Sequence, residues 1–284
     1  MTSSGIRAAL LAAVAVGCVS VAQSAELTVD QVLARNAEAR GGLAAWKRID
    51  SMQQIGTIVH HANLPGSHTD ATNAANGAAS PNAAKPELQA PFMLELKRPN
   101  KLHLEIQYQG TKAIQVFDGT RGYLAQPSAR GPVVQVMSPA TIQSLSQQMD
   151  IEGPLMSAAA HGASVRLEGL EQVEGRSAYK LTIQLPGGAE RHVWLDAVTF
   201  LDLKIDGTRL FNGRALPTET WFSDYRKVDD VYIPFAIDTS INGVHSMEGM
   251  VLSRILLNVP LEDAEFELPG GLPRPAGAAP GPAH

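Results

Sequence analysis

Cysteine is almost absent from this 284-residue sequence, which limits both its cross-links and its chemistry. The single cysteine, Cys18, lies near the N-terminus. If the segment that contains Cys18 is removed, the mature protein has no disulfide, no thiolate metal site and no cysteine nucleophile. Charged residues make up 18% of the chain, and no basic cluster accompanies the net charge of −5. This charge pattern argues against a nucleic-acid-binding surface.

The signatures of common enzymes are also missing. The sequence contains no G-x-S-x-G, no H-E-x-x-H and no glycine-rich phosphate loop. The eight histidines are scattered, and the densest group consists of His60, His61 and His68. We expect these three to be solvated side chains and not a metal site. The sequence therefore predicts a protein that is not an enzyme and carries no metal or cofactor.

Residues 1–25 have the pattern of a secretory signal peptide. Arg7 supplies the positive charge, residues 8–16 form an apolar run, and cleavage is expected after Ala22 or Ser24. The apolar run is too short to span a bilayer, which takes about 20 apolar residues. An alternative is a lipobox that ends at Cys18 and leaves this cysteine as a lipid-modified N-terminus.

The stretch from Pro91 to Tyr108 predicts two antiparallel strands with one apolar and one polar face. Apolar and polar residues alternate on both sides of a hinge that contains Pro99. A proline lacks a backbone donor and has a fixed φ, so it belongs at the corner between two strands. The alternating apolar residues are Phe92, Leu94, Leu96, Leu102, Leu104, Ile106 and Tyr108.

The segments before this stretch predict two helices, one strand and an insertion. Thr28 with Gln31 three residues later forms a capping-box pattern, and the helix that begins there should end at the glycines 41 and 42. Residues 43–49 predict a short second helix, and residues 51–60 predict the first strand. Residues 62–90 are mostly Ala, Asn, Gly, Ser and Pro, with too little apolar surface to repay the entropy of ordering. We therefore predict a mobile insertion there.

A helical interlude interrupts the strands in the middle of the chain. Ile142, Leu145 and Met149 form an apolar stripe at helical spacing, and residues 155–160 suggest a further helix that ends at Gly162. Strands surround this interlude, with turn signals such as Asp118-Gly119.

No alternation of strands and helices occurs elsewhere, so the sheet is expected to be antiparallel, with about eleven strands. Residues 26–269 are predicted to form one domain. Residues 270–284 are rich in Pro, Gly and Ala, and we expect a disordered tail there.

Several motifs, taken in order, resemble the LolA-like family of periplasmic lipoprotein carriers, in its divergent branch. The motifs are Leu96–Leu102 (LKRPNKL), Val116–Gly119 followed by Tyr123, Val193–Asp196, Leu201–Lys204, Phe222–Tyr225, Val231–Phe235 and Leu261–Leu268. The likeness extends from Leu27 to Pro269. It implies a mainly β fold with helices, in which a strongly curved, incomplete antiparallel β-barrel is covered by a helical lid. The insertion at 62–90 departs from the family pattern.

The resemblance also implies roles for particular residues. The arginine that matches Arg98 would hold the lid closed by donating hydrogen bonds to carbonyl groups at helix ends, for which the guanidinium has five donors. Apolar side chains on the concave face would line a cavity for acyl chains, although alternating aliphatic residues also serve as ordinary sheet core. The candidates are Leu94, Leu96, Leu102, Leu104, Ile106, Ile114, Val116, Ile142, Leu145, Met149, Trp221, Tyr232 and Phe235.

The predicted function is that of a periplasmic carrier of lipid or lipoprotein acyl chains in outer-membrane lipoprotein sorting. Its expected partners are these acyl chains and membrane-bound donor and acceptor proteins, with no nucleic acid, and the chain is expected to be a monomer. An alternative is a periplasmic regulatory module that senses lipid or lipoprotein on the same fold. A third alternative is a hydrolase on an unfamiliar β scaffold.

Overall fold

The structure is a computed structural model that describes residues 27–61, 87–146, 149–211 and 214–273. The predicted signal peptide with Cys18, most of the predicted insertion, the histidine at position 68 and most of the predicted tail lie outside these residues. Among the described helices, none is long and apolar enough to cross a membrane.

One antiparallel sheet dominates the described residues. Its strands are β1 (Ser51–His61), β2 (Glu87–Lys97), β3 (Lys101–Tyr108), β4 (Thr111–Phe117), β5 (Gly122–Gln126), β6 (Val133–Val136), β7 (Ser164–Val173), β8 (Arg176–Gln184), β9 (Glu190–Asp196), β10 (Asp202–Phe211), β11 (Arg214–Val228), β12 (Val231–Ile241) and β13 (Val244–Leu257). The helices are α1 (Val29–Ala39), α2 (Leu43–Lys47), α3 (Pro139–Ser146), α4 (Pro154–Ser157), η1 (Ala158–His161) and η2 (Asp263–Phe266).

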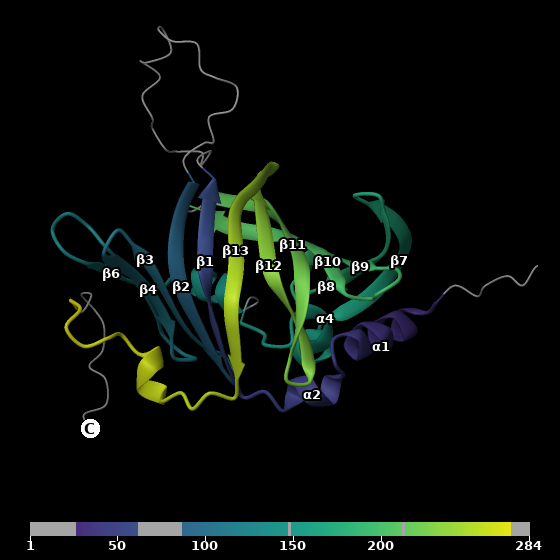
Figure 1. The fold of residues 1–284 in the computed structure, drawn as a ribbon, viewed down its shortest axis with the longest axis horizontal. Helices are drawn as coiled ribbons and strands as arrows, with labels where there is room; N and C mark the ends of the chain where they lie inside the picture. Colours follow the sequence, from purple (N-terminus) through teal and green to yellow (C-terminus); the bar gives the residue numbers. More distant parts are fainter. Residues whose placement is uncertain (1–26, 62–86, 147–148, 212–213, 274–284) are drawn as a thin grey trace, which may run out of the picture.

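The strand order joins two meanders through a single non-consecutive pair. Within the described residues, the order is β6-β5-β4-β3-β2-β1-β13-β12-β11-β10-β9-β8-β7, so β1 lies beside β13 in the middle of the sheet. The strands β6 and β7 are consecutive in the chain but form opposite edges. The segment between them, which carries α3, α4 and η1, therefore has to cross from one edge of the sheet to the other. Figure 1 shows the curved sheet, with α1 and α2 at one end of its strands.

The predicted fold class is confirmed, since the sheet is antiparallel, curved and not closed, with a few short helices. Two details differ from the sequence prediction. The sheet has thirteen strands within the described residues, where about eleven were expected. The predicted insertion also ends too late, because β2 begins at Glu87 and pairs there with His61.

The two N-terminal helices form as predicted. The Thr28 side chain accepts from the Gln31 backbone and the Gln31 side chain accepts from the Thr28 backbone, which is the expected capping box. At Gly41 the backbone has φ +103°, and a Cβ there would overlap with the carbonyl oxygen of Asp230. Only glycine fits this close approach between the end of α1 and the β11–β12 turn.

Three apolar clusters make up the core. The largest joins α2 to one face of β1, β2, β3, β12 and β13. The second packs α1 and α4 onto β8 and β9, and the third surrounds Trp194. The helices thus cover the sheet at two places, and the segment between β6 and β7 contributes to both of the larger clusters.

Candidate functional site

The strand register gathers most of the predicted cavity residues on one face of the sheet. Residues that are directly paired in an antiparallel sheet share a face, and Leu94 pairs with Leu104 as Leu96 does with Leu102. Nine of the thirteen candidates belong to the largest apolar cluster, which we call the concave cluster: Leu94, Leu96, Leu102, Leu104, Ile106, Ile142, Leu145, Met149 and Phe235.

The other four candidates lie outside the concave cluster. Val116 pairs with His103, and Ile114 lies two residues away on the same strand, so both face away from the concave cluster. Trp221 packs in the cluster around Trp194. Tyr232 is 38% exposed and lies between two buried neighbours, which puts its side chain on the opposite face of β12.

The lid segment between β6 and β7 places its own apolar side chains on the concave cluster. Ile142 and Leu145, both on α3, are half-buried, and both pack against that cluster. Met149 is buried there but lies beyond the end of α3, although its spacing predicted a helical position. In this structure side chains of the lid segment therefore cover part of the concave cluster.

Arg98, the predicted latch, lies at the corner between β2 and β3 and contacts two helical segments. Its Nε donates to the carbonyl oxygen of Ile49 at 2.7 Å, and one Nη donates to that of Trp46 at 3.3 Å, both at the end of α2. The guanidinium also pairs with the Glu152 carboxylate of the lid segment, at 2.7 Å and 3.3 Å. These contacts connect the sheet corner, α2 and the lid segment.

A second arginine, Arg40, holds the same lid residue and was not predicted from the sequence. Its Nη1 donates to the Glu152 carbonyl oxygen at 2.8 Å, and its guanidinium lies over the Trp46 ring, 4.5 Å from the centroid. The Arg40 side chain is 8% exposed and lies 3.6 Å from the Asp202 carboxylate. Its sequence position beside two glycines indicated only a helix end.

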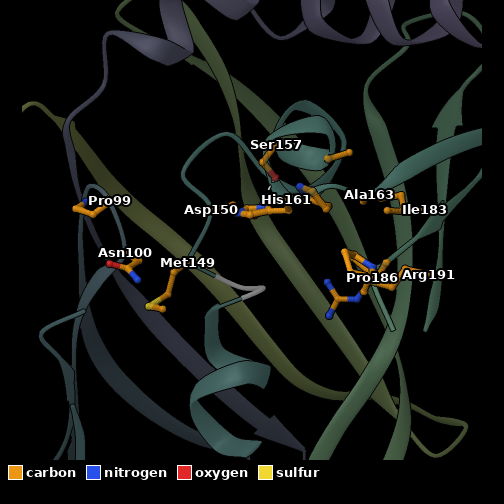
Figure 2. Close-up of a pocket in the computed structure, with 13 residues that line it drawn as sticks. Pro99, Asn100, Met149, Asp150, Ser157, His161, Ala163, Ile183, Pro186 and Arg191 are labelled. Carbon is orange, nitrogen blue, oxygen red and sulfur yellow. Dashed lines mark hydrogen bonds and ion pairs between the residues drawn. The ribbon is translucent and has the colours of Figure 1, made fainter. Parts of the chain in front are cut away.

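A pocket of about 360 Å³ opens beside the lid segment. It is lined by residues from the β2–β3 corner, the lid segment and the facing ends of β8 and β9 (Figure 2). Met149 and Ile183 provide apolar wall, while Asp150, His161 and Arg191 are its charged or titratable groups. Among the predicted cavity residues, only Met149 lines it.

Asp150 and Arg191 give this pocket its electrostatic character. Burial raises the pKa of Asp150, whereas a hydrogen bond from the Ser157 hydroxyl at 2.8 Å and His161 at 3.3 Å oppose this rise. Burial lowers the pKa of the Arg191 guanidinium, and the negative charges of Asp206 and Asp150 oppose that change. The guanidinium points away from β9 into the pocket (Figure 2).

Comparisons with known proteins identify the fold. No protein-family model matches the chain, and no curated protein matches it. A DUF1329 family protein from Desulfovibrio piger shares the fold with a TM-score of 0.53 and 14% identity, over 84% of this chain and 97% of that chain. Together with the open, curved sheet and its short helices, this match agrees with the architecture that the sequence motifs predict. The fold is LolA-like.

Two further solved structures match this chain. One is a LolA superfamily protein from Nitrosomonas europaea, with a TM-score of 0.49 and 16% identity over 85% of this chain and 98% of that chain. The other is a putative outer membrane lipoprotein-sorting protein domain from Vibrio parahaemolyticus, with a TM-score of 0.48 and 13% identity over 81% and 97%.

The residues that sequence reasoning missed in this LolA-like fold share one property. Arg40, Asp150, His161 and Arg191 come from α1, the lid segment and β9, which are far apart in the chain. Each is a single polar residue in a segment without any motif. Only the folded chain brings them to the lid and its pocket, so no local sequence signal marks them.

Proposed function

We propose that this protein is a periplasmic carrier that binds the acyl chains of lipids or lipoproteins in the hollow beneath the lid segment. The observation that carries this proposal is the position of Ile142, Leu145 and Met149. These lid residues lie on the concave cluster, where an acyl chain would replace them. The LolA-like fold supports the proposal because its sheet is curved (Figure 1) and the apolar cluster on its concave face is covered by the lid segment.

The energetics of such an exchange are favourable for long chains. Each buried CH₂ group contributes about 0.8 kcal/mol, so a chain of many such groups binds without specific polar contacts. Ile142 and Leu145 are only half-buried on the concave cluster, so moving them away costs less than exposing a fully buried core. An acyl chain that fills the hollow more completely therefore displaces the lid.

The two arginine contacts to Glu152 set how readily the lid opens. Arg98 holds the Glu152 carboxylate and Arg40 holds its carbonyl oxygen. Charge-assisted hydrogen bonds are stronger than neutral ones and depend on geometry. These hydrogen bonds keep the lid segment closed when no acyl chain is bound. They can break when an acyl chain binds. Arg98 is thus proposed as the lid latch.

Transport requires partners on both sides of the transfer. Acyl chains would come from a membrane-bound donor protein and pass to a membrane-bound acceptor, and the chain would act between them as a monomer. In this scheme the protein performs no chemistry on its cargo. The apolar hollow supplies the binding energy, and the latch supplies control of release.

Binding of a fluorescent fatty-acid analogue to the purified mature protein tests the proposal. Ile106, half-buried in the concave cluster, is replaced by tryptophan to fill the hollow, and Leu170, which is 64% exposed on β7, receives the same substitution as a control. We expect Ile106→Trp to weaken binding of the analogue at least tenfold, while Leu170→Trp leaves it unchanged. Mass spectrometry of the protein should also detect copurified lipid.

Two results would contradict the carrier hypothesis. If the purified protein carries no lipid and does not bind the analogue, it does not bind acyl chains. If Ile106→Trp and Leu170→Trp bind the analogue equally well, the acyl chain binds at a surface other than the concave cluster. Thermal unfolding of both variants ensures that a loss of binding by Ile106→Trp is not a loss of folding.

A further inference from the structure

Arg191 is a half-buried cation that makes no hydrogen bond or ion pair within the described part of the chain. It lies on β9, paired with Ile183 of β8, and its guanidinium lies beside Gly207 of β10. No hydrogen bond or ion pair reaches the guanidinium from any described residue. A charge that is partly withdrawn from water without a hydrogen-bonded partner is costly, and an anionic ligand would supply that partner.

The two nearby carboxylates are already engaged by other groups. Asp206 accepts from the His192 backbone N–H and pairs with His192 Nδ1, both at 2.6 Å, so that each of its oxygens is occupied. Asp150 accepts from the Ser157 hydroxyl and pairs with His161, both within the lid segment. Both carboxylates act on Arg191 only at a distance. The donors of the guanidinium are therefore available to a ligand.

The surroundings of Arg191 suit the head of an amphiphile. The guanidinium faces a pocket whose walls include the apolar side chains of Ile183, Leu185 and Met149. Met149 also packs in the concave cluster, so the pocket adjoins the proposed acyl-chain hollow. A ligand with an anionic head at Arg191 could therefore extend its chain into the place that Met149 takes on the concave cluster.

We propose that Arg191 is an anion-binding residue that selects amphiphiles with a phosphate or carboxylate head. The planar guanidinium offers donors in a fixed fork that matches both groups. In a half-buried pocket the contact is less screened by water than at the surface. This inference rests on the proposed acyl-chain function and adds a head-group preference to it.

Four probes separate the head group from the chain: oleic acid, 1-oleoyl lysophosphatidic acid, neutral 1-oleoylglycerol and inorganic phosphate alone. Binding of each to the mature protein is measured by isothermal titration calorimetry. We compare Arg191→Gln and Arg191→Lys with Arg130→Gln, which removes an exposed arginine in the β5–β6 turn. We expect the wild type and Arg130→Gln to bind both anionic lipids at least tenfold more tightly than the neutral lipid.

The expected result is that Arg191→Gln abolishes this preference without weakening the neutral lipid, and that Arg191→Lys keeps part of it. Binding of phosphate alone that depends on Arg191 would also support the anion site, and would identify a free anion as its ligand if no lipid binds. If Arg191→Gln binds all three lipids as the wild type does, the head-group proposal is wrong while the carrier proposal stands. If the wild type binds none of the four probes, both are wrong.

Discussion

At the scale of single residues, Glu152 is the point at which the lid segment is held. Its carboxylate pairs with Arg98 at the β2–β3 corner and its carbonyl oxygen accepts from Arg40 at the end of α1. The two arginines thus use different atoms of one residue. The Glu152 side chain in this pair is 14% exposed and the Arg98 side chain 30% exposed, so the ion pair is only partly screened by water.

Replacing Arg98 with methionine tests the latch. The variant keeps an unbranched apolar stem but removes the charged donors to the Glu152 carboxylate and to the carbonyl oxygens of Trp46 and Ile49. We expect the free energy of unfolding to fall by about 2 to 4 kcal/mol. The affinity for a fluorescent fatty-acid analogue should rise, roughly tenfold for each 1.4 kcal/mol by which the closed lid is weakened.

Arg48→Met is the matched control for this prediction. Arg48 also pairs with a carboxylate, that of Asp230, at 3.1 Å, but both side chains are largely exposed. Such a surface pair contributes about 0 to 1 kcal/mol, so both stability and affinity should stay near those of the wild type. A latch role for Arg98 is contradicted if Arg98→Met lowers affinity and stability together.

The sequence predicted only part of the site at this scale. Alternation shows which residues of one strand share a face, but the pairing between strands decides which face meets the lid. In β4, the alternation of apolar residues indicates Ile114 and Val116 as the buried side of the strand. The pairing shows otherwise: Phe117 pairs with Leu102 and joins the concave cluster, and Ile114 and Val116 face the other way. Arg98 was identified because it lies within a recognisable motif, whereas Arg191 has no such context.

At the scale of elements, the C-terminal segment fastens the β2–β3 corner from the other side. Lys97 donates to the Leu261 carbonyl oxygen at 2.7 Å, and both Lys97 and Lys101 contact the Asp263 carboxylate, at 2.8 Å and 2.9 Å. Phe266, also on η2, is fully buried. The same corner that presents Arg98 to the lid is therefore held in place by η2.

The stability of this attachment should depend on pH through Asp263. Hydrogen bonds from Lys97 and Lys101 lower the pKa of Asp263 from 3.8 to about 2. A carboxyl group whose pKa is lowered on folding stabilises the folded state above its unfolded pKa. This contribution is lost as the pH falls from about 3.8 to about 2. Asp263→Asn should therefore be less stable than the wild type at pH 6, and the difference should vanish near pH 2.

Urea unfolding of both proteins between pH 2 and pH 6 measures that difference. Glu267→Gln removes an exposed carboxylate from the same segment and should follow the wild-type curve. A difference between Asp263→Asn and the wild type that stays constant across the whole range would contradict the ion pairs with the two lysines. It would point instead to a packing effect of the substitution.

Most elements could be predicted because their signals are local. The capping box at Thr28, the turn at Asp118 and the left-handed Gly162 after η1 all occur where the sequence places them. The start of β2 was not predicted, although residues 87–90 (Glu-Leu-Gln-Ala) already differ from the Ala, Asn, Gly, Ser and Pro stretch before them. Their strand conformation comes from pairing with β1, which is a tertiary contact.

At the scale of the whole molecule, the topology itself makes the lid. The pairing of β1 with β13 puts the two ends of the folded chain in the centre of the sheet and its middle at the two edges. The connection from β6 to β7 then has to pass from one edge of the sheet to the other, and here its side chains pack on the concave cluster. The lid is therefore a consequence of strand order, and its short helices need only provide apolar side chains toward the sheet.

This arrangement predicts two levels of stability in one molecule, which amide hydrogen exchange can resolve. Amides of α3 should exchange through local opening at a lower free energy than those of β12, because β12 is paired on both sides and α3 rests on half-buried side chains. Adding oleic acid should accelerate exchange in α3 and slow it in β2 and β12, while exchange in η2 stays unchanged. If α3 instead became more protected together with the strands, the lid would close over the acyl chain and would not be displaced by it.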